Sequence, residues 1–115
     1  MSPEREWKFL LTDIVDAIER VQEYTSGMTY DGFNSDRRTI DAVTYNFVII
    51  GEAARRMPAA RRAQHPEIEW DEMMAMRHIL AHEYESVARD IVWSTIQENL
   101  PPLRAKLQRI LEQLS

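Results

Sequence analysis

The chain has 115 residues, of which 44% are hydrophobic and 29% charged, and this composition predicts one soluble domain spanning residues 1–115. It contains no cysteine, which excludes disulfides and thiolate metal sites and fits a cytoplasmic protein. The formal net charge is −5, so binding to nucleic acid would have to depend on a local basic patch. No apolar run resembles a signal peptide or reaches the length of a membrane span, so we expect no membrane association.

The first predicted element is an amphipathic helix before residue 25. Its apolar residues recur at alternating steps of four and three, which places them on one helix face. These residues are Trp7, Leu11, Ile14, Ile18 and Val21. The next stretch, Thr25 to Asp36, holds two of the three glycines and many turn residues, which predicts a loop.

A second helix should follow this loop, with Ser35 or Asp36 as its cap. Gly51 lies inside it and predicts a close approach of another helix, and Pro58 should end it. The apolar positions again recur at steps of three and four. They are Ile40, Val43, Phe47, Ile50, Ala54 and Met57.

The second half of the chain predicts two more helices. Residues 59–64 form at most a short turn, and residues 65–70 form a connector. Asp71 is placed to cap a helix of residues 72–85. A short joint at residues 86–90 should then lead to the last helix.

The last helix should start at Asp90, which is placed to cap it. Pro102 would remove one of its hydrogen bonds, so we expect a kink or short break there. No segment alternates with a period of two. The predicted fold class is therefore all-α, a bundle of four main helices plus a short helix or turn.

A basic patch surrounds Pro58, with only Glu52 nearby in the sequence to oppose its charge. It consists of Arg55, Arg56, Arg61 and Arg62. Cations at a helix C-terminus offset the helix dipole, and most such clusters are simply solvated. The alternative is a surface that contacts phosphates, which gains weight if a neighbouring site acts on RNA.

The stretch RHILAHEY, Arg77 to Tyr84, contains two of the three histidines. His78 and His82 would share one face of a helix, and Glu85 could complete a metal site. The zinc-protease pattern requires Glu directly after the first His, where this chain has Ile79. Two histidines four residues apart are common by chance, so we expect no metal and no cofactor.

Arg77 falls within the apolar stripe of the predicted helix, one turn from Met73 and from Leu80. An arginine in such a stripe is costly unless it is paired or faces a wet cleft. One interpretation is structural: a buried Arg–carboxylate pair beside a packed Tyr84, in a plain helical dimer.

The functional interpretation is metal-free cleavage of RNA. Histidine moves protons near neutral pH, and arginine holds a phosphate and stabilises charge in the transition state. The 2′-hydroxyl of the RNA would attack the adjacent phosphate, so no protein nucleophile is needed. One histidine per subunit would have to act as both general base and general acid. We therefore expect a two-fold dimer with two copies of Arg77 and His82 around one cleft.

The pattern R-x4-H-x-Y formed by Arg77, His82 and Tyr84 resembles the HEPN-domain toxins of HEPN/MNT toxin–antitoxin pairs, the HepT-like proteins. The resemblance covers nearly the whole chain. It includes the stretches RRTIDAVTYNFVIIGEAARRMP, HPEIEWDEMMAMRHILAHEYESV and VWSTIQENLPPL. The family commonly has a polar residue, often Asn, after the Arg, where this chain has His78.

This resemblance implies a HEPN-type helical bundle that forms a homodimer, with the motif lining the cleft between subunits. It also implies metal-independent endoribonuclease activity on cellular RNA, which makes such a protein a growth-arresting toxin. Arg77 and His82 would be the catalytic pair, and His78 would assist them.

Tyr84 matches the tyrosine that the partner of such toxins, a minimal nucleotidyltransferase antitoxin, modifies with AMP. Bulky anionic groups beside Arg77 would block the RNA site. The alternative is a non-catalytic HEPN partner subunit that binds a nucleotidyltransferase or a nucleotide. The presence of Arg77, His82 and Tyr84 together favours the nuclease.

Overall fold

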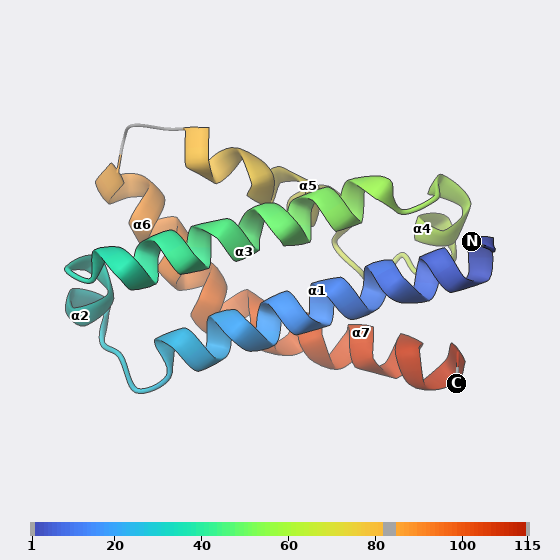
Figure 1. The fold of residues 1–115 in the computed structure, drawn as a ribbon, viewed down its shortest axis with the longest axis horizontal. Helices are drawn as coiled ribbons and strands as arrows, with labels where there is room; N and C mark the ends of the chain where they lie inside the picture. The colour runs from blue at the N-terminus through green and yellow to red at the C-terminus, as the bar shows by residue number, and fades with distance from the viewer. Residues whose placement is uncertain (1, 82–84, 115) are drawn as a thin grey trace.

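The described residues fold into helices joined by short turns and loops (Figure 1). The computed structural model describes the backbone of residues 2–81 and 85–114, and their side chains except those of residues 79–88. The elements in chain order are α1 (Pro3–Thr25), α2 (Tyr30–Asn34), α3 (Arg37–Arg56), α4 (Ala59–Gln64), α5 (Trp70–Ala75), the 3-10 helix η1 (Met76–Ala81), α6 (Glu85–Ser94), the π-helical segment η2 (Thr95–Asn99) and α7 (Leu100–Leu114). The predicted all-α class is confirmed for these residues.

The helix α3 occupies the centre of the arrangement. It packs along α1 on one side and against α5 and η1 on the other, while α7 runs along α1 (Figure 1). The short helix α2 and the start of α6 lie at one end of the molecule, and α4 lies at the other, near the N-terminus. Residues far apart in the sequence therefore meet along α3.

The apolar stripes predicted for the first two long helices form the core. In α1 all five predicted positions are fully buried, from Trp7 to Val21. In α3 the stripe from Val43 to Met57 is buried, and Ile40 is partly buried at its edge. The side chain of Ile96 in η2 and those of Leu100 and Leu107 in α7 close the core from the third side.

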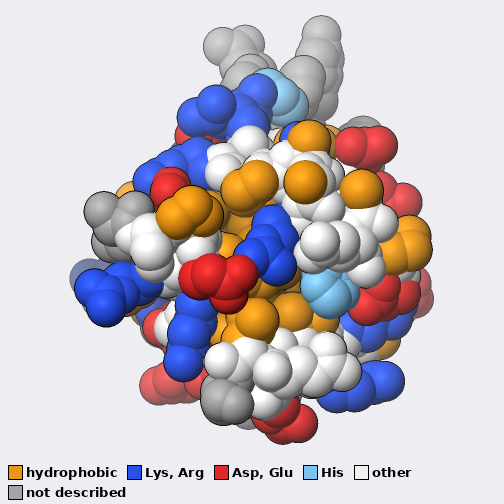
Figure 2. Space-filling view, turned by 90° about the vertical axis from the view of Figure 1, so that its right-hand side faces the viewer, with side chains coloured by type: hydrophobic (Ala, Val, Ile, Leu, Met, Phe, Trp, Pro, Cys, Tyr) orange, Lys and Arg blue, Asp and Glu red, His pale blue; other side chains and the backbone are white. Residues whose placement is uncertain are grey.

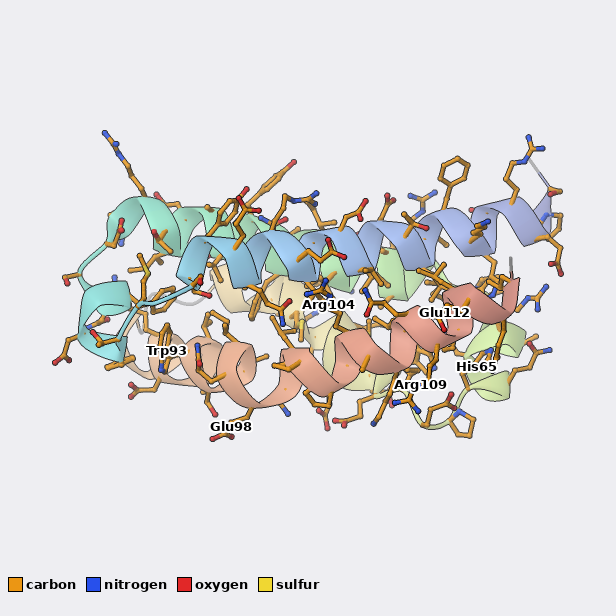
Figure 3. All side chains as sticks on the ribbon, turned by 90° about the horizontal axis from the view of Figure 1, so that it is seen from below. His65, Trp93, Glu98, Arg104, Arg109 and Glu112 are labelled. Atoms are coloured by element: carbon orange, nitrogen blue, oxygen red, sulfur yellow. The ribbon has the colours of Figure 1, made fainter. Side chains whose placement is uncertain are left out.

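Polar contacts fix the long helices relative to one another. Arg20 of α1 donates from Nε to Oδ1 of Asn46 on α3, at 2.9 Å, and Asn46 is almost completely buried. Arg104 of α7 lies between α7 and α1, where its Nη1 donates to Oε1 of Gln22 at 2.7 Å (Figure 3). Because a buried polar group is costly without a partner, these bonds select one register of the three helices.

The loop predicted for residues 25–36 is partly wrong, because it contains α2. The Thr29 side chain caps this helix by accepting from the backbone N–H of Gly32, at 3.1 Å. Phe33 is fully buried and packs on the Trp93 ring, with centroids 5.2 Å apart. Burial of the Phe33 ring thus stabilises a short helix within a stretch that is rich in turn-forming residues. Gly27 reverses the chain after α1 at a φ of 77°, which favours glycine.

Two of the three predicted caps differ from the structure. Asp36 caps α3 as expected, by accepting from the N–H of Thr39 at 3.2 Å. Asp71 is not a cap, since α5 already begins at Trp70, whose buried indole donates to the carbonyl of His65. Asp90 is not a cap either, because α6 runs through the predicted joint.

The helix is not broken at Pro102. The change in its hydrogen bonding lies about one turn earlier, in a π-helical segment. Residues Thr95–Asn99 form η2, and the N–H of Leu100 bonds to the carbonyl of Thr95, five residues back. Prolines 101 and 102 carry no N–H, so the helix must change its hydrogen bonding around them. Since α6 continues through η2 into α7, the number of main helices depends on whether these segments are counted as one.

None of the helices described here combines the length and the apolar character needed to cross a membrane.

We predict that Phe47→Ala lowers the free energy of unfolding by about 3–5 kcal/mol, because it opens a cavity in a fully buried part of the core. Urea unfolding followed by circular dichroism would measure this. The control is Tyr45→Ala on the same helix, where the side chain is 66% exposed and the loss should stay within about 0.5 kcal/mol. Equal losses for both variants would contradict the assignment of Phe47 to the core.

Candidate active site

Arg77 and His78 lie on the 3-10 helix η1, and the α-helix predicted for residues 72–85 ends at Ala75. A 3-10 helix has about three residues per turn, so steps of 3.6 do not describe the backbone from Met76 to Ala81. The α-helical spacing used to place Arg77 within an apolar stripe therefore ends at Ala75. His82 and Tyr84 lie outside the described residues, and their placement stays a prediction.

Gly51 brings α3 against the backbone of Arg77. A Cβ at Gly51 would lie 2.7 Å from the backbone N of Arg77, 2.9 Å from its Cβ and 3.2 Å from the carbonyl oxygen of Met73. These distances are too short for any side chain at position 51 without movement of the backbone. The predicted close approach at Gly51 is confirmed, and its partner is the start of η1.

The guanidinium of Arg77 makes two described contacts. Its Nη1 bonds to Oε1 of Glu52 at 3.1 Å, and its Nε donates to Nε2 of His78 at 3.3 Å. The side chain of Arg77 is 31% exposed and that of Glu52 is 44% exposed. The structural interpretation expected a buried Arg–carboxylate pair. The pair exists, but it is open to solvent, where a ligand can reach it.

Glu52 joins Arg77 to a second arginine on its own helix. Its Oε2 accepts from Nη2 of Arg55 at 3.0 Å and from Nε of Arg55 at 3.3 Å. The hydrogen bond from Arg55, followed by that from Arg77, holds the pKa of the Glu52 carboxyl below its ordinary value. Glu52 is therefore ionised at neutral pH, and the cluster of Arg55, Glu52 and Arg77 carries a net charge of +1.

Sequence reasoning missed the role of Glu52. It considered this residue only as an opposing charge for the basic patch. A signal was present, because Glu52 is the one acidic residue in the second half of its helix and directly follows Gly51. The residue next to a close helix contact lies at the edge of that contact, where a charged side chain can reach across it.

The contact with Arg77 orients the ring of His78. Nε2 of His78 accepts the Arg77 Nε–H at 3.3 Å, so this ring nitrogen faces the guanidinium. Nδ1 is the ring nitrogen that this contact leaves for a ligand. This fits the supporting role predicted for His78, which remains a prediction.

The basic patch is more neutralised than its sequence suggested. Two glutamates from the first turn of α1 approach it, in addition to Glu52. Arg56 lies 3.7 Å from Glu6, and Arg61 pairs with Glu4. Figure 2 shows blue and red side chains interspersed over this end of the molecule, without a continuous basic surface.

The four arginines therefore differ in what they contact. Arg56 and Arg61 connect α3 and α4 to α1, while Nη1 of Arg62 lies 3.4 Å from the sulfur of Met74. Only Arg55 shares a carboxylate with Arg77. Binding of RNA by all four arginines stays a prediction, and the geometry connects Arg55 most closely with the motif.

Metal ligation was considered for His78, His82 and Glu85. Within the side chains that the structure describes, no group of three or more His, Asp or Glu residues could hold a metal ion. The side chains of His82 and Glu85 are outside that set.

Comparison with known proteins places this arrangement in a family. The family described as Ribonuclease HepT-like matches residues 14–110. A probable ribonuclease HepT of Thermococcus cleftensis is 38% identical over 106 residues, which cover 92% of this chain and 96% of that protein. A putative RNase of Methanocaldococcus jannaschii is 30% identical over 97% of both chains. No solved structure matches the chain significantly.

The fold and the match over most of the chain define a helical ribonuclease domain. The chain belongs to the HepT-like ribonuclease family. The family resemblance stated from the sequence is thereby confirmed, and with it ribonuclease activity at the level of the family.

We predict that Gly51→Ala destabilises the protein by about 1–3 kcal/mol, because the added methyl overlaps the backbone at Arg77. Helix propensity alone predicts the opposite sign, since alanine is favoured over glycine inside a helix by about 1 kcal/mol. The sign of the change in urea unfolding therefore separates the two effects. A stabilised Gly51→Ala variant would contradict the close contact between α3 and η1.

Proposed function

We propose that the protein is a metal-independent endoribonuclease in which Arg77 and His82 act on the scissile phosphate. The observation that carries this proposal is the solvent-accessible Arg77 guanidinium, held by Glu52 and adjacent to His78, in a chain of the HepT-like ribonuclease family. An arginine fixed in this way can present N–H donors to a phosphate at little cost in side-chain entropy. The position of His82 comes from its match to the R-x4-H motif.

The proposed reaction uses the RNA's own 2′-hydroxyl. A general base removes its proton, the 2′-oxygen forms a bond to phosphorus, and the bond from phosphorus to the 5′-oxygen breaks as an acid protonates that oxygen. The products are a 2′,3′-cyclic phosphate and a 5′-hydroxyl. His82 supplies the proton transfers, and Arg77 stabilises the extra negative charge on the phosphoryl oxygens.

We propose further that the active unit is a homodimer with the motif at the cleft between subunits. One His82 per subunit cannot be base and acid on opposite sides of the same phosphorus. Two copies related by a two-fold axis supply both roles. His78, on the exposed side of η1, would orient Arg77 or the substrate.

The regulation we propose is AMP transfer to Tyr84 by a minimal nucleotidyltransferase, within a toxin–antitoxin pair. The tyrosine oxygen would form a bond to the α-phosphorus of ATP, pyrophosphate would leave, and the phenol proton would be lost. Each added AMP brings a negative charge close in sequence to Arg77, so it competes with RNA for the same cation.

We predict that the purified protein cleaves RNA in the presence of EDTA and leaves 2′,3′-cyclic phosphate ends. Arg77→Ala should lower kcat/KM by about 100-fold or more, since it removes a donor to the transition-state charge. His82→Ala should lower it by about 100- to 10,000-fold. Fluorescent-oligonucleotide assays and mass spectrometry of the ends would measure both.

The control for these variants is Arg37→Gln, at the far end of α3, which should cleave like the wild type. Circular dichroism must show that all variants are folded. A requirement for added metal, or full activity of His82→Ala, would contradict the proposal. A folded wild type that cleaves no RNA but binds a nucleotidyltransferase tightly would favour the non-catalytic alternative.

We predict that incubation with a minimal nucleotidyltransferase encoded beside this chain and with ATP raises the intact mass in steps of one AMP. Tyr84→Phe should abolish every step, because it removes the accepting oxygen. Tyr30→Phe is the control, and it should accept AMP as the wild type does. Mass steps that persist in Tyr84→Phe would show that another residue is the acceptor.

A further inference from the structure

We infer that Glu52 is a positioning residue for RNA cleavage. We also infer that the positive charge of Arg55 compensates for the negative charge that Glu52 places beside Arg77. This inference rests on the proposed ribonuclease function. In this arrangement Glu52 does not touch the substrate. It holds the Arg77 guanidinium in one orientation, while Arg55 holds Glu52 and keeps the cluster attractive to phosphate.

Arg77 is anchored at its backbone and at its guanidinium by two consecutive residues of α3. Its backbone rests against Gly51, with no room for a methyl group, and its Nη1 bonds to Glu52 at 3.1 Å. A long side chain on a 3-10 helix would otherwise sample several rotamers in solvent. Fixing both the backbone and the guanidinium reduces this freedom before any substrate binds.

The contacts of Arg77 with described residues use only part of its donors. The two contacts made with described residues use Nη1 and Nε, to Glu52 and His78 respectively. Neither contact involves Nη2. A phosphate can therefore bind at the Nη2 side while Glu52 keeps its bond, so substrate binding and positioning are compatible.

The net charge of the cluster formed by Arg55, Glu52 and Arg77 stays positive. A carboxylate paired with Arg77 alone would cancel its attraction for RNA. Arg55 donates two hydrogen bonds to the other oxygen of Glu52 and leaves the three residues with a net charge of +1. Arg56 and Arg61 pair with glutamates of α1, and Arg62 contacts the sulfur of Met74. Arg55 is the member of the basic patch that shares a carboxylate with Arg77.

Loss of the Glu52 charge should strengthen RNA binding and slow RNA cleavage. Glu52→Gln removes the negative charge and weakens the bond that orients Arg77. RNA should bind more tightly, because the local charge rises to +2, yet be cleaved more slowly, because Arg77 is no longer fixed. A group that only stabilises the fold would not lower KM and kcat together.

The experiment compares Glu52→Gln, Arg55→Gln and Asp41→Asn in RNA cleavage at several salt concentrations, with EDTA present. Asp41 is the matched control, since it is an exposed carboxylate on the same helix, 3.7 Å from Arg37. We expect Glu52→Gln to lower kcat by about 10- to 100-fold and also to lower KM. Arg55→Gln should raise KM and flatten the salt dependence by about 0.7 in the slope of log affinity against log salt. Asp41→Asn should match the wild type.

A second readout does not depend on activity. The Nη–H signals of Arg77, assigned by their loss in Arg77→Lys, should exchange with water faster in Glu52→Gln than in the wild type or in Asp41→Asn, because Glu52 accepts from Nη1. Unchanged kcat and unchanged exchange in a folded Glu52→Gln protein would overturn the inference. If the wild type itself cleaves no RNA, the proposed function fails, and the exchange measurement still decides whether Glu52 fixes Arg77.

Discussion

The close contact between Gly51 and the backbone at Arg77 is the constraint on which the rest of the site depends. It brings the start of η1 within 2.7 Å of where a Cβ on α3 would lie. The next residue, Glu52, can then reach the Arg77 guanidinium, and Arg55 one turn later can reach Glu52. A larger residue at position 51 would separate the two helices and break this series of contacts at its first step.

Much of the fold could be predicted from the sequence, because hydrophobic periodicity reports burial directly. The stripes of α1 and α3 were found in this way. The preference of helix N-termini for Ser and Asp narrowed the cap of α3 to Ser35 or Asp36, and the structure has Asp36. The short elements were not found in this way. Whether α2 forms depends on Phe33 packing against Trp93, and whether α5 begins at Trp70 depends on a bond to the carbonyl of His65. Such contacts join residues that local sequence does not connect.

The candidate site also combines features that the sequence predicts with contacts that it does not predict. The R-x4-H-x-Y motif and the close approach at Gly51 were visible in the sequence, whereas the pairing of Arg77 with Glu52 was not, since 25 residues separate them. The change from α-helix to 3-10 helix at Met76 also escaped prediction. A 3-10 helix has about three residues per turn, so alignments that assumed 3.6 residues per turn do not hold across it. The family match over residues 14–110 confirms the class but does not by itself supply these contacts.

The central claim is that Arg77, held in place by α3, binds the phosphate at which RNA is cut. A crystal structure with an RNA oligonucleotide carrying 2′-O-methyl groups tests this most directly, because the blocked 2′-oxygen cannot attack. The account predicts a phosphate oxygen within hydrogen-bonding distance of the Arg77 guanidinium, with Glu52 still bound to Nη1. RNA bound only to the arginines of α4, Arg61 and Arg62, with Arg77 making no phosphate contact, would contradict it.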